Sequence, residues 1–348
     1  MRTTSRQAAP NPKSFQVNYN LVVAEACTAQ QVRAERGEIS LATAKNFSSR
    51  CHRYLLPFLD RCEAVNQRFD WLSFFGSTSV AALSSASRRQ VAQTVARVFI
   101  QSDVPELIQL AERIPRIRTQ SVPRGGFTPQ ELLALWRTAR RLSNPQTISL
   151  KPGTHRETQG GLFTKDMPIP LEMRWLIAFM VNSFMRPSDL KNLQHQHVEV
   201  VRGRHTYLRL RLPESKRHTE TIITLRPAVR IYEQLLALSD LRGRSSPMDY
   251  VFYPEVRNRK TAMMAMDHHF RRVLEASGLR QGQRGQTRSL YSLRHTAITF
   301  RLLYGQGIDL LTLAKNARTS VAMIEKFYAS ELNPEMNVAM LQSRRGVG

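Results

Sequence analysis

The sequence predicts a mainly α-helical protein with one small antiparallel β-meander. Apolar residues recur at three- and four-residue intervals between about residues 25 and 105, as expected for helices. The apolar run LEMRWLIAFMVNSF is followed by segments of alternating polarity, and helical spacing then returns at AMMAMDHHFRRVLEASG. At roughly 100 to 200 residues per domain, a chain of 348 residues is long enough for two domains.

The first of these domains is expected to be helical. The leading stretch, MRTTSRQAAPNPKSFQ, is polar, contains proline and lacks the apolar run of a signal peptide. We expect a flexible arm over residues 1–24 and a helical domain over 25–115, with Ser40 as one helix N-cap.

Within this domain, SSASRRQVAQTVARVFIQS places three valines on one helical face and three arginines, Arg88, Arg89 and Arg97, elsewhere. These arginines fit either a solvated surface or a phosphate-binding one.

The second domain is predicted over residues 127–335, after a Pro-, Gly- and Arg-rich linker at 116–126. Its first helix has Thr128 as the expected N-cap and Glu131 three residues later, which is a capping box. Little periodicity is found over 143–169, where we expect a long polar loop. We treat residues 336–348 as a C-terminal tail that docks on its own domain or on a neighbouring copy.

The β-meander is expected in the segments HVEVV, YLRLRL and TETIITL, which alternate with the period of strands. The polar stretch PESKRH reads as the turn between the last two strands. Just before the meander, the apolar helix breaks within MRPSDL, where Pro187 is expected to begin a second, short helix.

Charge is the strongest global signal. The chain has 51 Lys and Arg residues against 27 Asp and Glu, a formal net charge of +24 at pH 7, which indicates a polyanionic partner such as nucleic acid. No apolar run reaches the roughly 18 residues of a membrane span. The three cysteines, Cys27, Cys51 and Cys62, form no CxxC pair, so neither a disulfide framework nor a zinc site is expected.

Three basic residues far apart in the sequence lie at predicted element boundaries. Arg186 lies at the break of the apolar helix, Lys216 in the hairpin turn, and Arg294 in the expected first turn of a helix with apolar neighbours. A buried guanidinium is costly without an anionic partner. Arg294 is therefore expected either to pair with a carboxylate or to bind phosphate.

The pattern of these residues resembles that of the tyrosine recombinases, also called phage integrases. In that family an apolar helix ends in Arg with an acid three residues later, and a hairpin Lys, an HxxRH segment, a G(H or T)S segment and a Tyr follow in order. Here Arg186 with Asp189, Lys216, YSLRH, RTS and Tyr328 occupy those places. The resemblance implies a helical core-binding domain and an α+β catalytic domain.

The resemblance also implies a reaction at DNA phosphates. Arg186 and Arg294 would stabilise the non-bridging oxygens, Lys216 would protonate the departing 5′ oxygen, and Tyr328 would form a covalent 3′-phosphotyrosine. No metal or nucleotide cofactor is needed for this chemistry. Arg217, beside Lys216, is a further candidate for DNA contact.

Three positions depart from the family pattern. Tyr291 stands where most members have His, Thr319 stands where they have His or Trp, and Arg318 replaces Gly and adds a cation. Tyr and Thr can donate to a phosphate oxygen but are weak bases at neutral pH. Asp189 fits an orienting role or a helix ion pair, and His295 fits a structural neighbour of Arg294.

From these features we expect a site-specific recombinase or integrase that binds double-stranded DNA. It would act as a homotetramer on paired sites, be a monomer in solution, and reside in the bacterial cytoplasm at the nucleoid, away from membranes. Three alternatives stay open: a catalytically degenerate DNA-binding relative, a type IB topoisomerase-like enzyme, and a basic RNA-binding protein.

Overall fold

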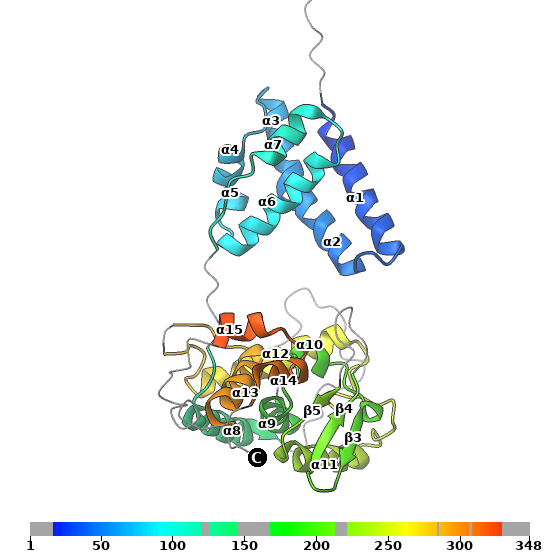
Figure 1. Ribbon diagram of the computed structural model, residues 1–348, viewed down its shortest axis with the longest axis vertical. Helices are drawn as coiled ribbons and strands as arrows, with labels where there is room; N and C mark the ends of the chain where they lie inside the picture. The colour runs from blue at the N-terminus through cyan, green and yellow to red at the C-terminus, as the bar shows by residue number, and fades with distance from the viewer. Residues whose placement is uncertain are drawn as a thin grey trace, which may run out of the picture. The chain divides into compact units, whose positions relative to one another are not determined.

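The computed structural model describes residues 17–119, 125–144, 168–212, 221–283, 285–305 and 308–328, with the backbone alone at 144 and 328. The chain forms two compact units, Met1–Ser121 and Val122–Gly348 (Figure 1). None of the described helices is both long enough and apolar enough to cross a membrane.

The described part of the first unit is helical. Its elements are α1 (Tyr19–Glu35), α2 (Leu41–Arg50), a π-helical turn (Cys51–Leu55), α3 (Leu56–Ala64), α4 (Trp71–Gly76), α5 (Thr78–Ala81), α6 (Ser85–Ile100) and α7 (Pro105–Glu112). The expectation of a flexible arm up to residue 24 is wrong at its end, because α1 already begins at Tyr19 after the N-cap Asn18. Ser40 caps α2 as expected, since its side chain accepts from the Thr43 amide.

Aromatic side chains fill the core of this unit. Phe69 meets Phe58 edge-on at 5.6 Å between ring centroids and meets Phe99 edge-on at 4.9 Å. Trp71, 5% exposed, also meets Phe69 edge-on, and its indole N–H donates to the Leu110 carbonyl at 2.7 Å. Edge-to-face pairs add about 1 kcal/mol each beyond simple burial. The aromatic core thus holds the loop before α4 against α6 and α7.

The second unit combines helices with a small sheet. Its helices are α8 (Pro129–Leu142), α9 (Glu172–Ser183), α10 (Pro187–Leu190), α11 (Pro227–Leu241), α12 (Arg259–Ala276), α13 (Leu290–Tyr304), α14 (Leu310–Asn316) and α15 (Val321–Tyr328). Its strands are β1 (Ser143–Asn144), β2 (Ile169–Pro170), β3 (Val198–Val201), β4 (Tyr207–Leu210) and β5 (Ile222–Ile223).

The meander expected from the alternating segments is confirmed. Strands β3, β4 and β5 form an antiparallel sheet in sequence order, with Val200 opposite Leu208 and Leu210 opposite Ile222. Helix α11 packs against β4 (Figure 1). The other pair, β1 and β2, is parallel and closes the two ends of the predicted 143–169 loop, whose residues 145–167 lie outside the described part.

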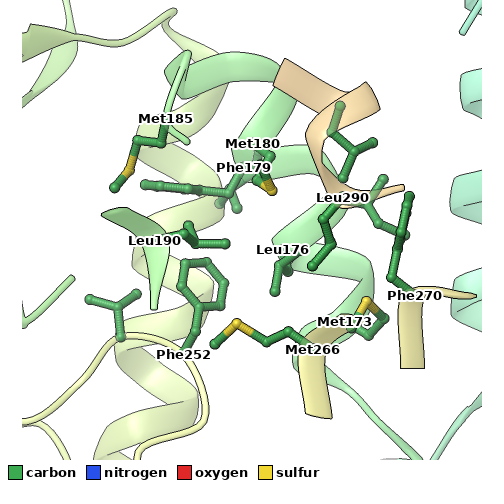
Figure 2. Close-up of a cluster of buried hydrophobic side chains, with 14 of the residues drawn as sticks. Met173, Leu176, Phe179, Met180, Met185, Leu190, Phe252, Met266, Phe270 and Leu290 are labelled. Atoms are coloured by element: carbon green, nitrogen blue, oxygen red, sulfur yellow. The ribbon is translucent and has the colours of Figure 1, made fainter. Parts of the chain in front are cut away.

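Helix α9 runs through the centre of this unit and packs against α8, α11, α12 and α13. Its apolar character on several faces, visible in the sequence, follows from that position. Leu176, Phe179 and Met180 are fully buried, and Figure 2 shows them among Leu190 of α10, Phe252, Met266 and Leu290. The core therefore joins α9 directly to the start of α13.

Most helix ends near the predicted site residues lie where the sequence analysis predicted them. Thr128 and Glu131 form the expected capping box, and Pro187 opens α10 as expected. Arg294 was expected in the first turn of its helix, but it is the fifth residue of α13 and lies in the second turn, because the N-cap is Ser289. Residues His195–His197 form a 3₁₀ turn directly before β3.

Candidate active site

The break after α9 places Arg186 at the start of α10. Phe184 ends α9 in the left-handed region, with φ at 57°, and Met185 is fully buried. Arg186 is extended, with ψ at 149°, as expected for a residue that precedes a proline. The side chain of Arg186 thus leaves the backbone at the point where the apolar helix has turned.

Arg294 joins two chain segments through its guanidinium. This residue is 2% exposed, and its Nη1 donates to the Phe184 carbonyl while its Nη2 donates to the Ala317 carbonyl at 2.6 Å. Both acceptors are residues at helix C-termini, where carbonyls lack partners within the helix. These bonds fix the orientation of a side chain that could otherwise adopt many rotamers.

The turn after α14 supplies the second acceptor. The Thr319 amide donates to Ala314 at 2.9 Å and the Arg318 amide donates to Lys315 at 2.9 Å, which is the hydrogen-bond pattern of a Schellman motif. Arg318 takes the left-handed position, with φ at 49°, which glycine usually occupies. We call residues 317–319 the arginine turn.

Arg186 reaches this same turn. Its Nη2 donates to the carbonyl of Arg318, and its Nη1 lies 3.8 Å from an oxygen of Asp189. The ion pair is long, and its side chains are 26% and 22% exposed, so it contributes little to stability. Of the two roles expected of Asp189, the structure records the helix ion pair, with Arg186 as its partner.

The structure therefore brings Arg186, Arg294, Arg318 and Thr319 together, although they come from three separate segments. Arg318 is 2% exposed and Thr319 is half-buried. Tyr291 lies in the first turn of α13 and is 37% exposed. Such a gathering of cationic side chains favours binding of an anion.

The predicted nucleophile is carried on the next helix. After Thr319, Ser320 caps α15, since the Met323 amide meets the Ser320 hydroxyl at 3.3 Å. Ile324 is 1% exposed in a cluster with Phe184 and Ala317, so α15 packs against the segments that hold the arginines. Tyr328 is the last residue of α15, and its side chain lies outside the described part.

Two other predicted site residues, Lys216 and Arg217, also lie outside the described residues. Strand β5, which follows their segment, is held at the site by a side chain that the sequence gave no reason to single out. Asn316 accepts from the Ile223 amide at 2.7 Å and donates to the Ile223 carbonyl at 3.0 Å. The side-chain amide of Asn316 therefore forms the main-chain hydrogen bonds that a further strand would form with Ile223 at the edge of the described sheet.

His295 lies beside Arg294 on α13 and is 7% exposed. Burial lowers its pKa to about 4, because the desolvated imidazolium is disfavoured. The ring is therefore neutral at pH 7. This state suits the structural role expected of it, and it makes His295 a weak proton acceptor.

Among the described residues, no group of three or more His, Cys, Asp or Glu side chains could hold a metal ion.

The arginines predicted in the first unit differ from one another. Arg88 is half-buried, and its Nη2 donates to the Ala81 carbonyl at 2.7 Å, which ties α6 to α5. Arg89 and Arg97 are exposed and, being eight residues apart on α6, lie on one face of that helix.

Residues 162–331 match the family model described as the phage integrase family. These residues form a phage integrase domain. The resemblance to the tyrosine recombinases, inferred above from motifs, is thereby confirmed, and the integrase domain contains every predicted catalytic position. Comparison with curated protein sequences gives no match.

Solved structures share the fold at low sequence identity. XerH site-specific recombinase, in a post-cleavage complex with its palindromic difH substrate, is 11% identical with a TM-score of 0.59, over 95% of this chain and 98% of that one. A lambda integrase dimer bound to a COC′ core site is 15% identical with a TM-score of 0.55, over 89% of this chain and 76% of that one. The Tn1549 transposon integrase bound to transposon right end DNA is 12% identical with a TM-score of 0.53, over 92% of this chain and 98% of that one.

Proposed function

We propose that this integrase-family chain is a site-specific DNA recombinase that cleaves and rejoins duplex DNA through a covalent 3′-phosphotyrosine on Tyr328. The observation that carries the proposal is the meeting of Arg186 and Arg294 at the arginine turn. Both guanidinium groups are oriented there by main-chain carbonyls, directly before the helix that bears Tyr328.

The chemistry follows from the charge that develops on the phosphate. When a phenolic oxygen attacks a phosphodiester, negative charge grows on the non-bridging oxygens in the transition state. Groups that are already oriented stabilise this charge without reorganising during the reaction. Arg186 and Arg294 would do so, and hydroxyl donors on Tyr291 and Thr319 would add hydrogen bonds.

Lys216 would protonate the 5′ oxygen as it leaves. The bond between phosphorus and that oxygen breaks as the bond to Tyr328 forms, so the number of phosphate ester bonds is conserved. Attack by the 5′ hydroxyl of another strand then releases the tyrosine and joins the strands. These steps need no other energy source.

Affinity for DNA would come mainly from phosphate contacts by exposed arginines such as Arg89 and Arg97, and would fall steeply with salt. A homotetramer on two paired DNA sites is the expected working form, with a monomer in solution. A location at the bacterial nucleoid belongs to the same proposal.

A covalent capture experiment tests the function. The full chain is incubated with a library of duplexes that contain a random core and a nick near the centre, so that the cleaved strand loses a short fragment and rejoining is blocked. Protein bound after denaturation is isolated and its DNA is sequenced. We expect covalent adducts enriched in one core sequence, and none with Tyr328→Phe.

The same experiment separates the rivals. Equal binding of DNA by wild type and Tyr328→Phe, with no adduct from either, would point to a degenerate DNA-binding protein and contradict the proposal. Adducts without sequence preference, together with relaxation of any supercoiled plasmid, would point to topoisomerase-like activity. Tight binding to structured RNA with no DNA adduct would point to an RNA-binding protein.

A further inference from the structure

Arg288 is a buried cation that the motif analysis did not single out. It directly precedes Ser289, the N-cap of α13, and is 3% exposed. Its Nη2 lies 2.7 Å from an oxygen of Glu131, and its Nε donates to the Gly126 carbonyl at 3.0 Å. Its guanidinium also lies over the ring of Phe127, 4.6 Å from the centroid. Arg288 therefore joins the start of α13 to the segment that precedes α8.

Glu131 has a second role at the same place. The oxygen that pairs with Arg288 also accepts the Thr128 amide at 2.9 Å, and the Thr128 hydroxyl accepts the Glu131 amide at 3.2 Å. The capping box and the ion pair thus share one carboxylate. This sharing fixes the backbone of residues 126–128 relative to both α8 and α13.

The fixed segment lies directly against the residues that follow Arg294. The Phe127 amide donates to the Thr296 hydroxyl at 2.9 Å, and Thr296 is fully buried. A Cβ atom placed on Gly126 would lie 3.1 Å from Cδ2 of His295, so only glycine fits without a shift of a few tenths of an ångström. We call these contacts of Gly126, Phe127, Glu131 and Arg288 the entry clamp.

The entry clamp contacts α13 at 295 and 296, while Arg294 on the same turn binds the carbonyls of Phe184 and Ala317. A displacement of the clamped turn would therefore carry the Arg294 backbone with it. Rates of catalysed reactions are sensitive to sub-ångström placement of the groups that stabilise the transition state.

We propose that Arg288 is a positioning residue for the proposed reaction: through the entry clamp it sets where the Arg294 guanidinium meets the phosphate. Its effect on cleavage rests on the proposed function. Its effect on the orientation of Arg294 does not, and can be measured without DNA.

Two substitutions disturb the entry clamp at different residues, and a third substitution elsewhere is the matched control. Arg288→Lys keeps the charge but loses the fork that reaches both Glu131 and Gly126. Gly126→Ala leaves every clamp side chain in place and displaces His295. Arg242→Gln removes another Arg–Glu pair outside the entry clamp, in which Arg242, the C-cap of α11, lies 2.6 Å from the buried Glu172 of α9.

The first readout is the side-chain Nε–H signal of Arg294 in ¹⁵N-arginine NMR spectra of the full chain, assigned by its loss in Arg294→Lys. We expect Arg288→Lys and Gly126→Ala to shift or broaden this signal, and Arg242→Gln to leave it in place. Melting temperatures of all three variants identify any general loss of fold. An Arg294 signal that is unchanged in both clamp variants would overturn the proposal.

The second readout is the single-turnover rate of adduct formation on the captured core sequence at saturating protein. We expect a decrease of about tenfold for both clamp variants with unchanged DNA affinity, and a rate within about twofold of wild type for Arg242→Gln. Wild-type rates in the clamp variants would also overturn the proposal. If wild type forms no adduct, the proposed function fails, and the NMR result alone decides on the positioning of Arg294.

Discussion

The two units of the chain use arginine in different ways. In the first unit, Arg89 and Arg97 are exposed on one face of α6. In the second, Arg294 and Arg318 are each 2% exposed, and Arg186 and Arg294 donate to main-chain carbonyls at helix ends. An exposed arginine adds charge to a surface without a fixed direction, whereas a buried one bonded to carbonyls has a set orientation.

Under the proposed function, this difference separates the arginines that bind DNA from those that act in catalysis. Flexible surface cations neutralise phosphates and make affinity depend on salt. Oriented cations stabilise charge at one point in space and therefore act on the rate. The net charge of +24 by itself makes no such distinction. The predictions below test whether the two kinds of arginine have separable effects.

The largest expected effect is that of Arg294→Gln on cleavage. Loss of one preorganised donor to a developing oxyanion typically slows a reaction by about 10²- to 10³-fold, so adduct formation should slow by at least this factor. DNA affinity, measured by fluorescence anisotropy, should change by less than about threefold. The exposed Arg230 of α11 provides the control, because Arg230→Gln should retain the wild-type rate.

A pH effect on stability is expected from two buried histidines. Burial lowers the pKa of His295 to about 4 and that of His269 to about 3. Between those values and about 6.5 the unfolded chain binds more protons than the folded one, so stability is highest above pH 6.5 and falls as the pH is lowered. For His295 the loss between pH 7 and pH 4 is on the order of 3 kcal/mol.

Urea unfolding at a series of pH values measures this effect. His295→Gln removes one of the two titrations, so its stability should change less between pH 7 and pH 4 than that of wild type. An identical pH dependence in wild type and variant would show that His295 is protonated at the same pH whether folded or unfolded.

A smaller effect on stability is expected at Asn316. Asn316→Ala removes both hydrogen bonds to Ile223 and leaves an edge strand without that partner. The free energy of unfolding should fall by about 1 to 2 kcal/mol. Asn192→Ala, at an exposed position, should change it by less than about 0.5 kcal/mol. Equal losses in the free energy of unfolding of the two variants would show that the hydrogen bonds between Asn316 and Ile223 do not stabilise the fold.

The smallest expected effect is that of the exposed arginines. Arg89→Ser and Arg97→Ser should each weaken DNA binding several-fold and reduce the slope of log K against log salt by about 0.9, as expected for one lost phosphate contact. The single-turnover cleavage rate at saturating protein should not change. A reduced rate with unchanged affinity in either variant would abolish the distinction between the two kinds of arginine.

Much of the fold was predictable because its signals are local. The period of apolar residues located the helices and the meander, and side-chain oxygens at Ser40 and Thr128 located two helix starts. The start of α1 at Tyr19 was missed, because Asn18 is a weak signal next to a polar, proline-containing stretch.

The site was predictable only in part, because many of its partners are main-chain carbonyls. The residues Phe184 and Ala317 accept hydrogen bonds from Arg294 through atoms that every residue has, so no sequence pattern identifies them. Arg288 and Glu131 are 157 residues apart, and they meet only because the fold brings the start of α8 to the residue before the N-cap of α13. The roles of Lys216 and Tyr328 stay predictions.

Peptide mapping of the captured adduct tests the central claim most directly. After digestion by protease and nuclease, mass spectrometry identifies the peptide that carries a residual nucleotide and the phosphate end through which it is joined. We predict a single modified peptide that contains Tyr328, linked to the 3′ phosphate of the cleaved strand. A nucleotide attached to another residue, or through a 5′ phosphate, would contradict the account.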